Sequence, residues 1–230
     1  MIHSSGPPPR YTPTRGVRDE GFDEHGDPRA AFAPIYAAFR ERGASSLERR
    51  WDEVQRAMRD HGLALAGDDD RGASRPFELD PVPLVIDSAT WSTIERGVRQ
   101  RARLTEAFLD DVYGERRLLE QRVLPPAMVL AHPQYARPCL GLSPGKLGHL
   151  SLYAADLVRG PDGRFHVVAE HTQTPPGAGY VLENRVVISR MLGAAFRDAH
   201  AQRLASFFLR LRETLADLAP QHRDNPRIVL

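Results

Sequence analysis

Apolar residues recur every three to four positions in five segments of the chain, a spacing that covers one face of an α-helix. The five segments are residues 28–42, 45–61, 88–113, 183–196 and 204–218. Ser45 or Ser46 is expected to cap the second helix, and Asp87 or Ser88 the third. The residues expected to end helices are Gly62, Gly114 and Pro220.

The pattern changes between residues 150 and 168, where side chains on the two faces alternate as they do in a β-strand. Residues 160–163, Gly-Pro-Asp-Gly, interrupt this region with a strong turn signal, so we predict an antiparallel hairpin. A short apolar run at residues 83–86 predicts one more strand. Together these elements predict an α+β fold, in which a helical N-terminal region packs with an antiparallel hairpin or sheet.

Residues 1–19 are rich in proline and glycine and hold few apolar side chains, so we expect a disordered arm there and a folded region over residues 20–230. Residues 67–83 are acidic and rich in proline and are expected to form a loop. The three aspartates at 68–70 lack the alternating acceptors and the distal glutamate of a calcium loop. We therefore interpret them as part of a solvated loop.

Composition narrows the class of protein. A chain of 230 residues with 41% hydrophobic residues can bury the core of one large domain or two small ones. The net charge of +1 argues against a nucleic-acid binder, and the single cysteine, Cys139, excludes an internal disulfide. No apolar run reaches the roughly 20 residues that span a bilayer, and the N-terminus lacks the apolar core of a signal peptide. We expect a soluble cytoplasmic protein with no nucleic-acid or membrane partner.

Several well-known catalytic motifs are absent from the sequence. There is no GxxxxGK[ST] phosphate loop, no GxSxG nucleophile elbow and no HExxH zinc motif. The run GAGY at residues 177–180 holds two glycines of a dinucleotide fingerprint but not the third. A Rossmann site, a P-loop site and a hydrolase triad are therefore not expected.

Polar side chains gather in and after the predicted hairpin. Asp156 lies on its first strand, and Glu170 and His171 end the second, where side chains can project over the edge of the sheet. Carboxylates in such a place suit a metal or a phosphate-bound metal. An ordinary sheet edge can show the same residues.

The loop and the predicted helix after the hairpin hold further residues that could bind phosphate or metal: two glycines, a glutamate, an asparagine and an arginine. Gly177 and Gly179 allow the backbone to approach phosphate oxygens. Glu183 and Asn184 are expected to open a helix, where their oxygens would lie near its free N–H groups and suit Mg²⁺, and Arg185 could balance phosphate charge. In the alternative interpretation, Glu183 and Asn184 only cap the helix and Arg185 pairs with Glu170.

These segments together resemble the N-terminal part of the circularly permuted ATP-grasp type 2 family, over roughly residues 19–230. The segments that carry the resemblance are RDEGFDEHGDPR, DPVPLVI, WSTIERGVRQRARLTEAFLDDVYG, AHPQYARPC, LYAADLVRGPDGRFHVV, HTQTPPGAGYVLENRVVISR and RDNPRIVL. The hairpin is also distantly similar to glutathionylspermidine-synthase-type ligases, with Asp156 at the hairpin acid and Thr174-Pro175 at the Thr-Pro of their loop. His171 departs from both patterns, which have arginine or asparagine at this place.

The resemblance implies a bacterial ATP-dependent ligase that uses ATP and Mg²⁺. Such an enzyme joins a carboxylate to an amine, both small molecules or peptides, through an acyl phosphate. The residues expected to be catalytic are Arg185 and Glu170. The residues expected to bind nucleotide are Gly177, Gly179, Gln173, Thr174 and Lys146. The residues expected to bind metal are Glu183, Asn184 and Asp156.

Members of the family that the chain resembles continue well beyond NPRIVL, so we expect a partial ATP-grasp architecture that is truncated at its C-terminus. In that case the chain would hold part of the substrate and metal surface. The alternative function is a non-enzymatic module that binds partner proteins through the arginine-rich helix at 94–113, or an inactive fragment.

Overall fold

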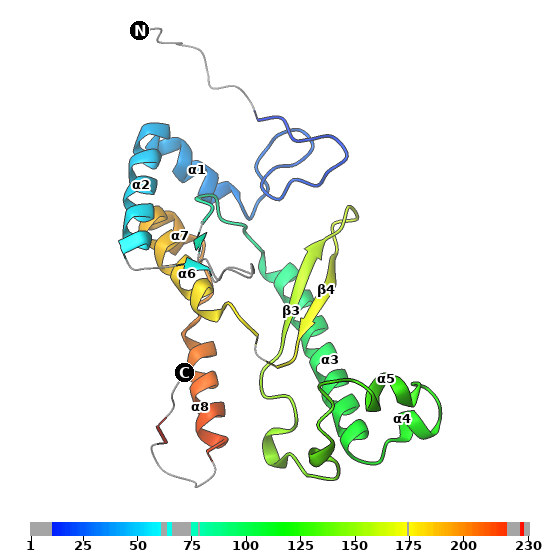
Figure 1. Ribbon diagram of the computed structural model, residues 1–230. Coiled ribbons are helices and arrows are strands. Elements are labelled where there is room, and N and C mark those ends of the chain that lie inside the picture. Colours follow the sequence, from blue (N-terminus) through cyan, green and yellow to red (C-terminus); the bar gives the residue numbers. More distant parts are fainter. Residues whose placement is uncertain are drawn as a thin grey trace. The chain divides into compact units, whose positions relative to one another are not determined.

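The computed structural model describes residues 11–60, 64–65, 75–77, 79–173, 175–219 and 226–227. Its α-helices are α1 (Ala33–Arg42), α2 (Ala44–Asp60), α3 (Ser88–Tyr113), α4 (Arg117–Glu120), α5 (Pro126–Leu130), α6 (Ala178–Leu192), α7 (Ala194–Asp198) and α8 (Ala205–Asp217) (Figure 1). Its strands are β1 (Ala64–Leu65), β2 (Arg75–Pro76), β3 (Ala154–Arg159) and β4 (Phe165–His171), and two short 3₁₀ turns are η1 (Arg137–Cys139) and η2 (Gly145–Leu147). Helices and antiparallel strand pairs together confirm the α+β fold class.

The chain divides into two compact units. Unit 1 comprises Met1–Asp87, Pro161–Gly163 and Gly177–Gln202, and unit 2 comprises Ser88–Gly160, Arg164–Pro176 and Arg203–Leu230. The predicted site residues are divided between the two units, because the division falls at Gly177.

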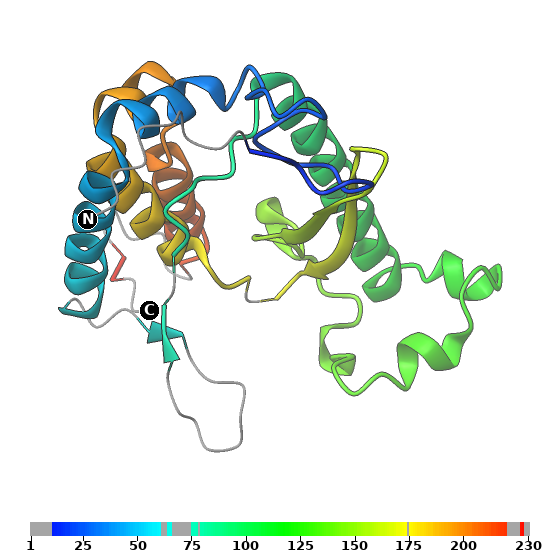
Figure 2. The same cartoon turned by 90° about the horizontal axis from the view of Figure 1, so that it is seen from above.

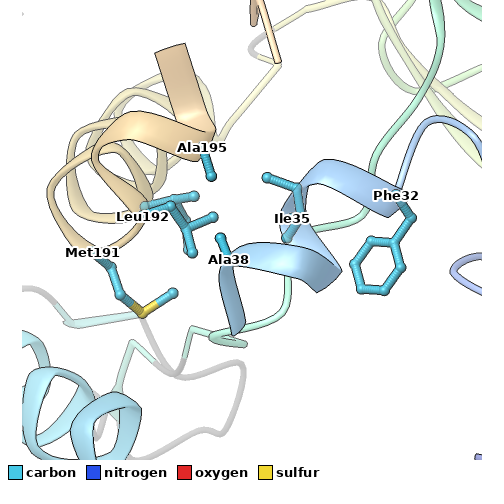
Figure 3. Close-up of a cluster of buried hydrophobic side chains, with 7 residues drawn as sticks. Phe32, Ile35, Ala38, Met191, Leu192 and Ala195 are labelled. Carbon is cyan, nitrogen blue, oxygen red and sulfur yellow. The ribbon is translucent and has the colours of Figure 1, made fainter. Parts of the chain in front are cut away.

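The core of unit 1 lies between α1 and the α6–α7 pair. Its buried side chains are Phe32, Ile35, Ala38, Ile188, Met191, Leu192 and Ala195. Figure 3 shows Leu192 and Ala195 pointing toward Ile35 and Ala38 of α1. Spacings of three and four residues place these side chains on one face of each helix, so the two apolar faces meet and exclude water.

Two arginines bind the carbonyl groups at the C-terminal end of α6. Arg42 Nη2 donates to Leu192 O at 3.1 Å, and Arg50 Nη1 donates to Met191 O at 3.3 Å. The last carbonyls of a helix have no partner within it and carry a partial negative charge, so guanidinium groups there satisfy and stabilise the helix end. These bonds join α1 and α2 to α6.

Unit 2 consists mainly of the long helix α3 and the hairpin of β3 and β4, which lies alongside it in both views (Figures 1 and 2). The strands pair antiparallel from Ala154 opposite His171 to Arg159 opposite Phe165, with a bulge between Asp156 and Leu157. The loop before β3 is tied to α3 by Glu106, whose carboxylate oxygens accept the backbone N–H groups of His149 and Leu150 at 2.6 and 2.7 Å.

Several predicted elements are confirmed. Helix α3 begins at Ser88 and ends at Tyr113, before Gly114, and α8 covers most of the predicted segment 204–218. The antiparallel hairpin turns at residues 160–163 as expected. The first predicted helix begins later than residue 28, because the preceding residues form a loop in which Asp23 Oδ1 accepts the backbone N–H groups of His25 and Asp27, both at 2.9 Å.

Two local predictions are wrong. Residues 83–86 form no strand, and Val85 instead packs against the core of unit 1, so the apolar run reflects burial rather than ladder hydrogen bonds. Ser45 and Ser46 do not cap α2, because the helix already begins at Ala44, directly after Gly43, which ends α1 at φ +70°.

Other predictions fall partly or wholly outside the described residues. Residues 68–70 lie outside them, and so does the segment NPRIVL except for Pro226 and Arg227. Within the expected arm, residues 11–19 are described, and the Tyr11 hydroxyl donates to the carboxylate of Asp19. The arm and the boundary at residue 19 stay predictions.

Candidate functional site

The glycine run GAGY forms the first turn of α6. Gly177 stands at the N-cap with φ +101°, a left-handed conformation that favours glycine, and as a glycine it provides no side-chain cap. A Cβ added at Gly177 or Gly179 would have no heavy atom within 4 Å, so this end of the helix is open. Free backbone N–H groups in open space are a suitable place for anionic oxygens.

The expectation that Glu183 and Asn184 open the helix is wrong. Helix α6 begins at Ala178, so both residues lie in its second turn, past the free N–H groups. The glycines suggested a loop through residue 180. Only Gly177 adopts a positive φ, however, and Gly179 is helical, so the helix starts earlier than the composition indicates.

Helix geometry separates the two charged residues of the Glu-Asn-Arg run. Successive residues are rotated by about 100° around the helix axis, so Glu183 and Arg185 project in directions about 160° apart. Glu183 lines a cavity against α2, whereas the guanidinium of Arg185 lies over the ring of Phe196 at 5.6 Å from its centroid. Asn184, between them, is exposed. The structure does not bring Glu183 and Arg185 together.

A cavity of about 630 Å³ lies between α2 and α6 in unit 1; we call it the α2–α6 cavity. Its lining residues are Ser46, Arg49, Arg50, Glu53, Val54 and Met58 of α2 with Glu183, Val187, Arg190 and Met191 of α6. Three arginines and two glutamates thus meet four apolar side chains. Because its volume lies within the range of roughly 300–1,000 Å³ found for small-molecule sites, it can hold a small polar ligand.

Glu170, in unit 2, is bound by two side chains outside its own strand. Arg101 Nε of α3 donates to Glu170 Oε1 at 2.7 Å, and the Tyr153 hydroxyl donates to the same oxygen. The hydrogen bond from Arg101 holds the pKa of Glu170 below its ordinary value, and Tyr153 lowers it further. Burial and the bond to Glu170 raise the pKa of Tyr153. Glu170 therefore offers a fixed, ionised carboxylate rather than a proton acceptor near neutral pH.

Asp156 projects from the other face of the hairpin. Side chains alternate along a strand, and Asp156 pairs with Ala169, next to Glu170 in sequence, so Asp156 and Glu170 lie on opposite faces. Asp156 Oδ2 lies 3.0 Å from His171 Nε2, and both side chains are partly exposed. Asp156 and Glu170, which were predicted to act together, are not brought together.

The other predicted nucleotide ligands are spread through unit 2. Gln173 Nε2 donates to Gln134 Oε1 at 3.5 Å. Lys146 lies in η2, and neither its side chain nor Thr174 is among the described parts of the chain. Over the described residues, no three His, Cys, Asp or Glu side chains are grouped so that they could hold a metal ion. The roles of all these residues stay predictions.

Comparison with known proteins places the chain in a family. Residues 83–230 match the family described as "Circularly permuted ATP-grasp type 2". The chain belongs to this family. The match includes α3, the hairpin, the glycine loop and α6, so the candidate residues from Asp156 to Arg185 all lie within the part shared with other circularly permuted ATP-grasp proteins.

The chain is also similar to uncharacterized proteins of mycobacteria. One from Mycobacterium tuberculosis is 36% identical over 222 residues, which cover 92% of this chain and 25% of the relative. One from Mycobacterium leprae is 32% identical over 212 residues, which cover 92% of this chain and 37% of the relative. A second from M. tuberculosis is 31% identical over 236 residues, which cover 96% of this chain and 42% of the relative. The chain thus spans a quarter to less than half the length of these relatives.

Arg101, Tyr153 and the cavity arginines were not among the residues predicted from the sequence. Arg101 and Glu170 are 69 residues apart, and no periodicity or turn signal relates a helix residue to a strand residue at that distance. In the part of the chain that the structure describes, no helix combines the length and the apolar character needed to cross a membrane.

Glu170→Gln is expected to lower stability at neutral pH but not in acid. The folded-state pKa of Glu170 is depressed, so its contribution is present above its unfolded pKa of about 4.3 and is lost as pH falls through the folded value. Because its side chain is 32% exposed, solvent screens the pair with Arg101, and we expect the thermal midpoint to fall by only about 1–3 °C at pH 7. Thermal unfolding of both proteins between pH 3 and pH 7 measures the difference.

The matched control is Glu95→Gln. Glu95 lies on α3, the helix that carries Arg101, and its Oε1 is 2.6 Å from Nη2 of Arg99, one turn away on the surface of that helix. Surface pairs at this spacing contribute little, so its midpoint should change less at both pH values. An equal loss for Glu170→Gln at pH 3 and pH 7 would contradict the role assigned to its charge.

Proposed function

We propose that this chain is part of an ATP-dependent ligase that joins a carboxylate to an amine. The observation that supports the proposal is the membership of residues 83–230 in the circularly permuted ATP-grasp family. The γ-phosphoryl group of ATP would pass to a substrate carboxylate, giving an acyl phosphate and ADP. The amine nitrogen would then attack the acyl carbon, phosphate would leave, and the nitrogen would lose a proton to give the amide. Such chemistry depends on charges placed around phosphates rather than on a protein nucleophile.

The start of α6 is the place in this chain best suited to the phosphates of ATP. Gly177 and Gly179 leave it open, and the N-cap residue Gly177 supplies no side-chain cap. A helix N-terminus stabilises negative charge through these groups and through the helix dipole. The residues present therefore fit a bound phosphate.

Mg²⁺ would neutralise phosphate charge when it is bound. It commonly takes only one or two protein carboxylates, together with phosphate oxygens and water, so a cluster of three acidic side chains is not required. Glu183, half-buried on the same helix as the glycine turn, is the residue we propose as its ligand in unit 1. For Asn184 and Asp156 as further metal ligands, we rely on the family resemblance.

The remaining assignments also rest on the resemblance. We propose Glu170 as a fixed anion and Arg185 as a cation in the reaction, consistent with the ion pair of Glu170 with Arg101. Gln173, Thr174 and Lys146 are proposed to contact nucleotide. The substrates would be a carboxylate and an amine, each a small molecule or a peptide.

Gly179→Glu is expected to weaken MgATP binding by at least about tenfold, because a carboxylate would then stand among the N–H groups proposed to bind phosphate. We expect the unchanged chain to bind MgATP with a Kd between about 10 µM and 1 mM, measured by isothermal titration calorimetry. The new side chain has room, since nothing lies within 4 Å of a Cβ at this position. An acidic residue in a first turn also stabilises a helix, so the thermal midpoint should be unchanged or higher.

Gly179→Lys is the matched control. It adds a side chain of similar size and opposite charge, so MgATP binding should be retained or strengthened while the helix is slightly destabilised. Equal affinities for the two variants would exclude the start of α6 as the phosphate site. No MgATP binding to the unchanged chain would remove the proposal and favour a protein-interaction module.

A further inference from the structure

The α2–α6 cavity combines an apolar floor with charges of both signs. Met58, Val187 and Met191 are only 4%, 5% and 2% exposed and, with Val54, form the apolar part of the lining. Aliphatic and thioether side chains favour an aliphatic group of a ligand, because its burial removes apolar surface from water.

The charged side chains of the cavity are available for a ligand. In the described part of the chain, the side chains of Arg49, Glu53 and Arg190 form no hydrogen bond or ion pair with other residues. Arg50 is different, because its guanidinium donates to Met191 O and holds the end of α6. The cavity therefore presents two unpaired guanidinium groups and one unpaired carboxylate beside apolar surface.

We propose that the α2–α6 cavity binds the amine substrate, and that this substrate is an α-amino acid or the amino-acid end of a short peptide with an aliphatic side chain. The proposal rests on the ligase function proposed above. The substrate carboxylate would bind Arg49 and Arg190, its ammonium group would bind Glu53, and its side chain would lie against Val54, Met58 and the buried part of α6.

The mixture of charges distinguishes this ligand from others of similar size. A nucleoside triphosphate inside the cavity would place its oxygens near Glu53, which costs electrostatic free energy. A wholly apolar ligand would leave the charged groups of the lining without partners. A zwitterion with an aliphatic side chain satisfies all three features of the cavity.

The position of Glu183 connects this cavity to the proposed reaction. Glu183 lines the cavity and is also the residue proposed to bind Mg²⁺. An amino acid whose carboxylate is held by Arg190 would lie against the same face of α6 as Glu183, two turns away.

The test is a titration of the ¹⁵N-labelled full chain with L-leucine, L-leucinamide and N-acetyl-L-leucine, followed by NMR chemical shifts. We expect L-leucine to bind with a Kd of about 1–10 mM and to shift the amide signals of α2 and α6. Leucinamide lacks the carboxylate and N-acetyl-leucine lacks the ammonium group, so each should bind at least about tenfold more weakly.

Variants assign the binding to the cavity. Arg190→Gln should weaken the binding of L-leucine at least about tenfold and leave the binding of leucinamide unchanged. Glu53→Gln should also weaken the binding of L-leucine at least about tenfold, but leave the binding of N-acetyl-leucine unchanged. The control is Glu48→Gln. Glu48 is an exposed residue of α2 that does not line the cavity, so this change should not affect the binding of any of the three compounds. Because all three residues are on the surface of their helices, their replacement should preserve the fold.

Equal binding of the three compounds, or no shift in α2 and α6 with L-leucine, would overturn the proposal. If MgATP binds but L-leucine does not, the cavity assignment fails and the ligase function stands. If L-leucine binds at the cavity but MgATP does not bind, the site stands as an amino-acid site and the ligase function fails.

Discussion

Leu192→Ala is expected to lower the free energy of unfolding by about 2–5 kcal/mol, the largest effect of any change discussed for this chain. Leu192 is 0% exposed and belongs to the cluster that joins α1 to α6 and α7. Truncation to alanine loses the free energy gained by transferring the deleted methyl groups from water into the core. It also leaves a cavity that the close-packed neighbours fill only partly. Urea unfolding followed by circular dichroism measures the change.

The control for this prediction is Leu182→Ala. It makes the same substitution on the same helix, but Leu182 is 40% exposed and outside the core cluster, so the expected loss is below about 1 kcal/mol. Similar losses for the two variants would show that the α1–α6 contact does not hold unit 1 together.

Glu106→Ala is expected to lower the free energy of unfolding by about 2–3 kcal/mol. The carboxylate accepts two backbone N–H groups, of His149 and Leu150, in a part-buried position, and its loss would leave both donors without that acceptor. The fit is close, since a Cβ added at Gly148 (φ +73°) would lie 2.3 Å from Glu106 Oε1. The carboxylate thus anchors the loop that leads into β3.

Hydrogen exchange separates local from global effects of this change. The amides of His149 and Leu150 should exchange faster in Glu106→Ala even where unfolding is rare, because they lose their acceptor directly. Glu95→Ala, which removes an exposed carboxylate from the same helix, should leave both amides unchanged. Unchanged protection in Glu106→Ala would contradict the anchoring role.

The elements with strong local signals could be predicted from the sequence. The periodicity of α3 and the glycine at residue 114 define a helix because both act within a few residues. The Gly-Pro-Asp-Gly turn likewise predicts the hairpin before any contact is known. The first turn of α6 could not be predicted, because glycine permits both a loop and a helix and only the observed backbone distinguishes Gly177 from Gly179.

For the candidate site, too, the sequence predicted which residues are present but not how they are arranged. The sequence identified a stretch rich in acids, glycine and arginine, but it could not show that Glu183 faces α2 while Arg185 lies over Phe196. It also could not show that Glu170 is held by Arg101 of α3. These partners depend on which helix faces meet, and many pairings are compatible with one pattern of polar residues.

By itself, then, the sequence determined the long helix α3, the hairpin and the family to which this chain belongs, because each is encoded in short-range spacing or in the order of motifs. Only the tertiary structure decided which charges meet and where a cavity forms. In unit 1, burial of the apolar faces of α1, α2 and α6 fixes how the helices pack, and this packing also positions the charged residues that line the cavity.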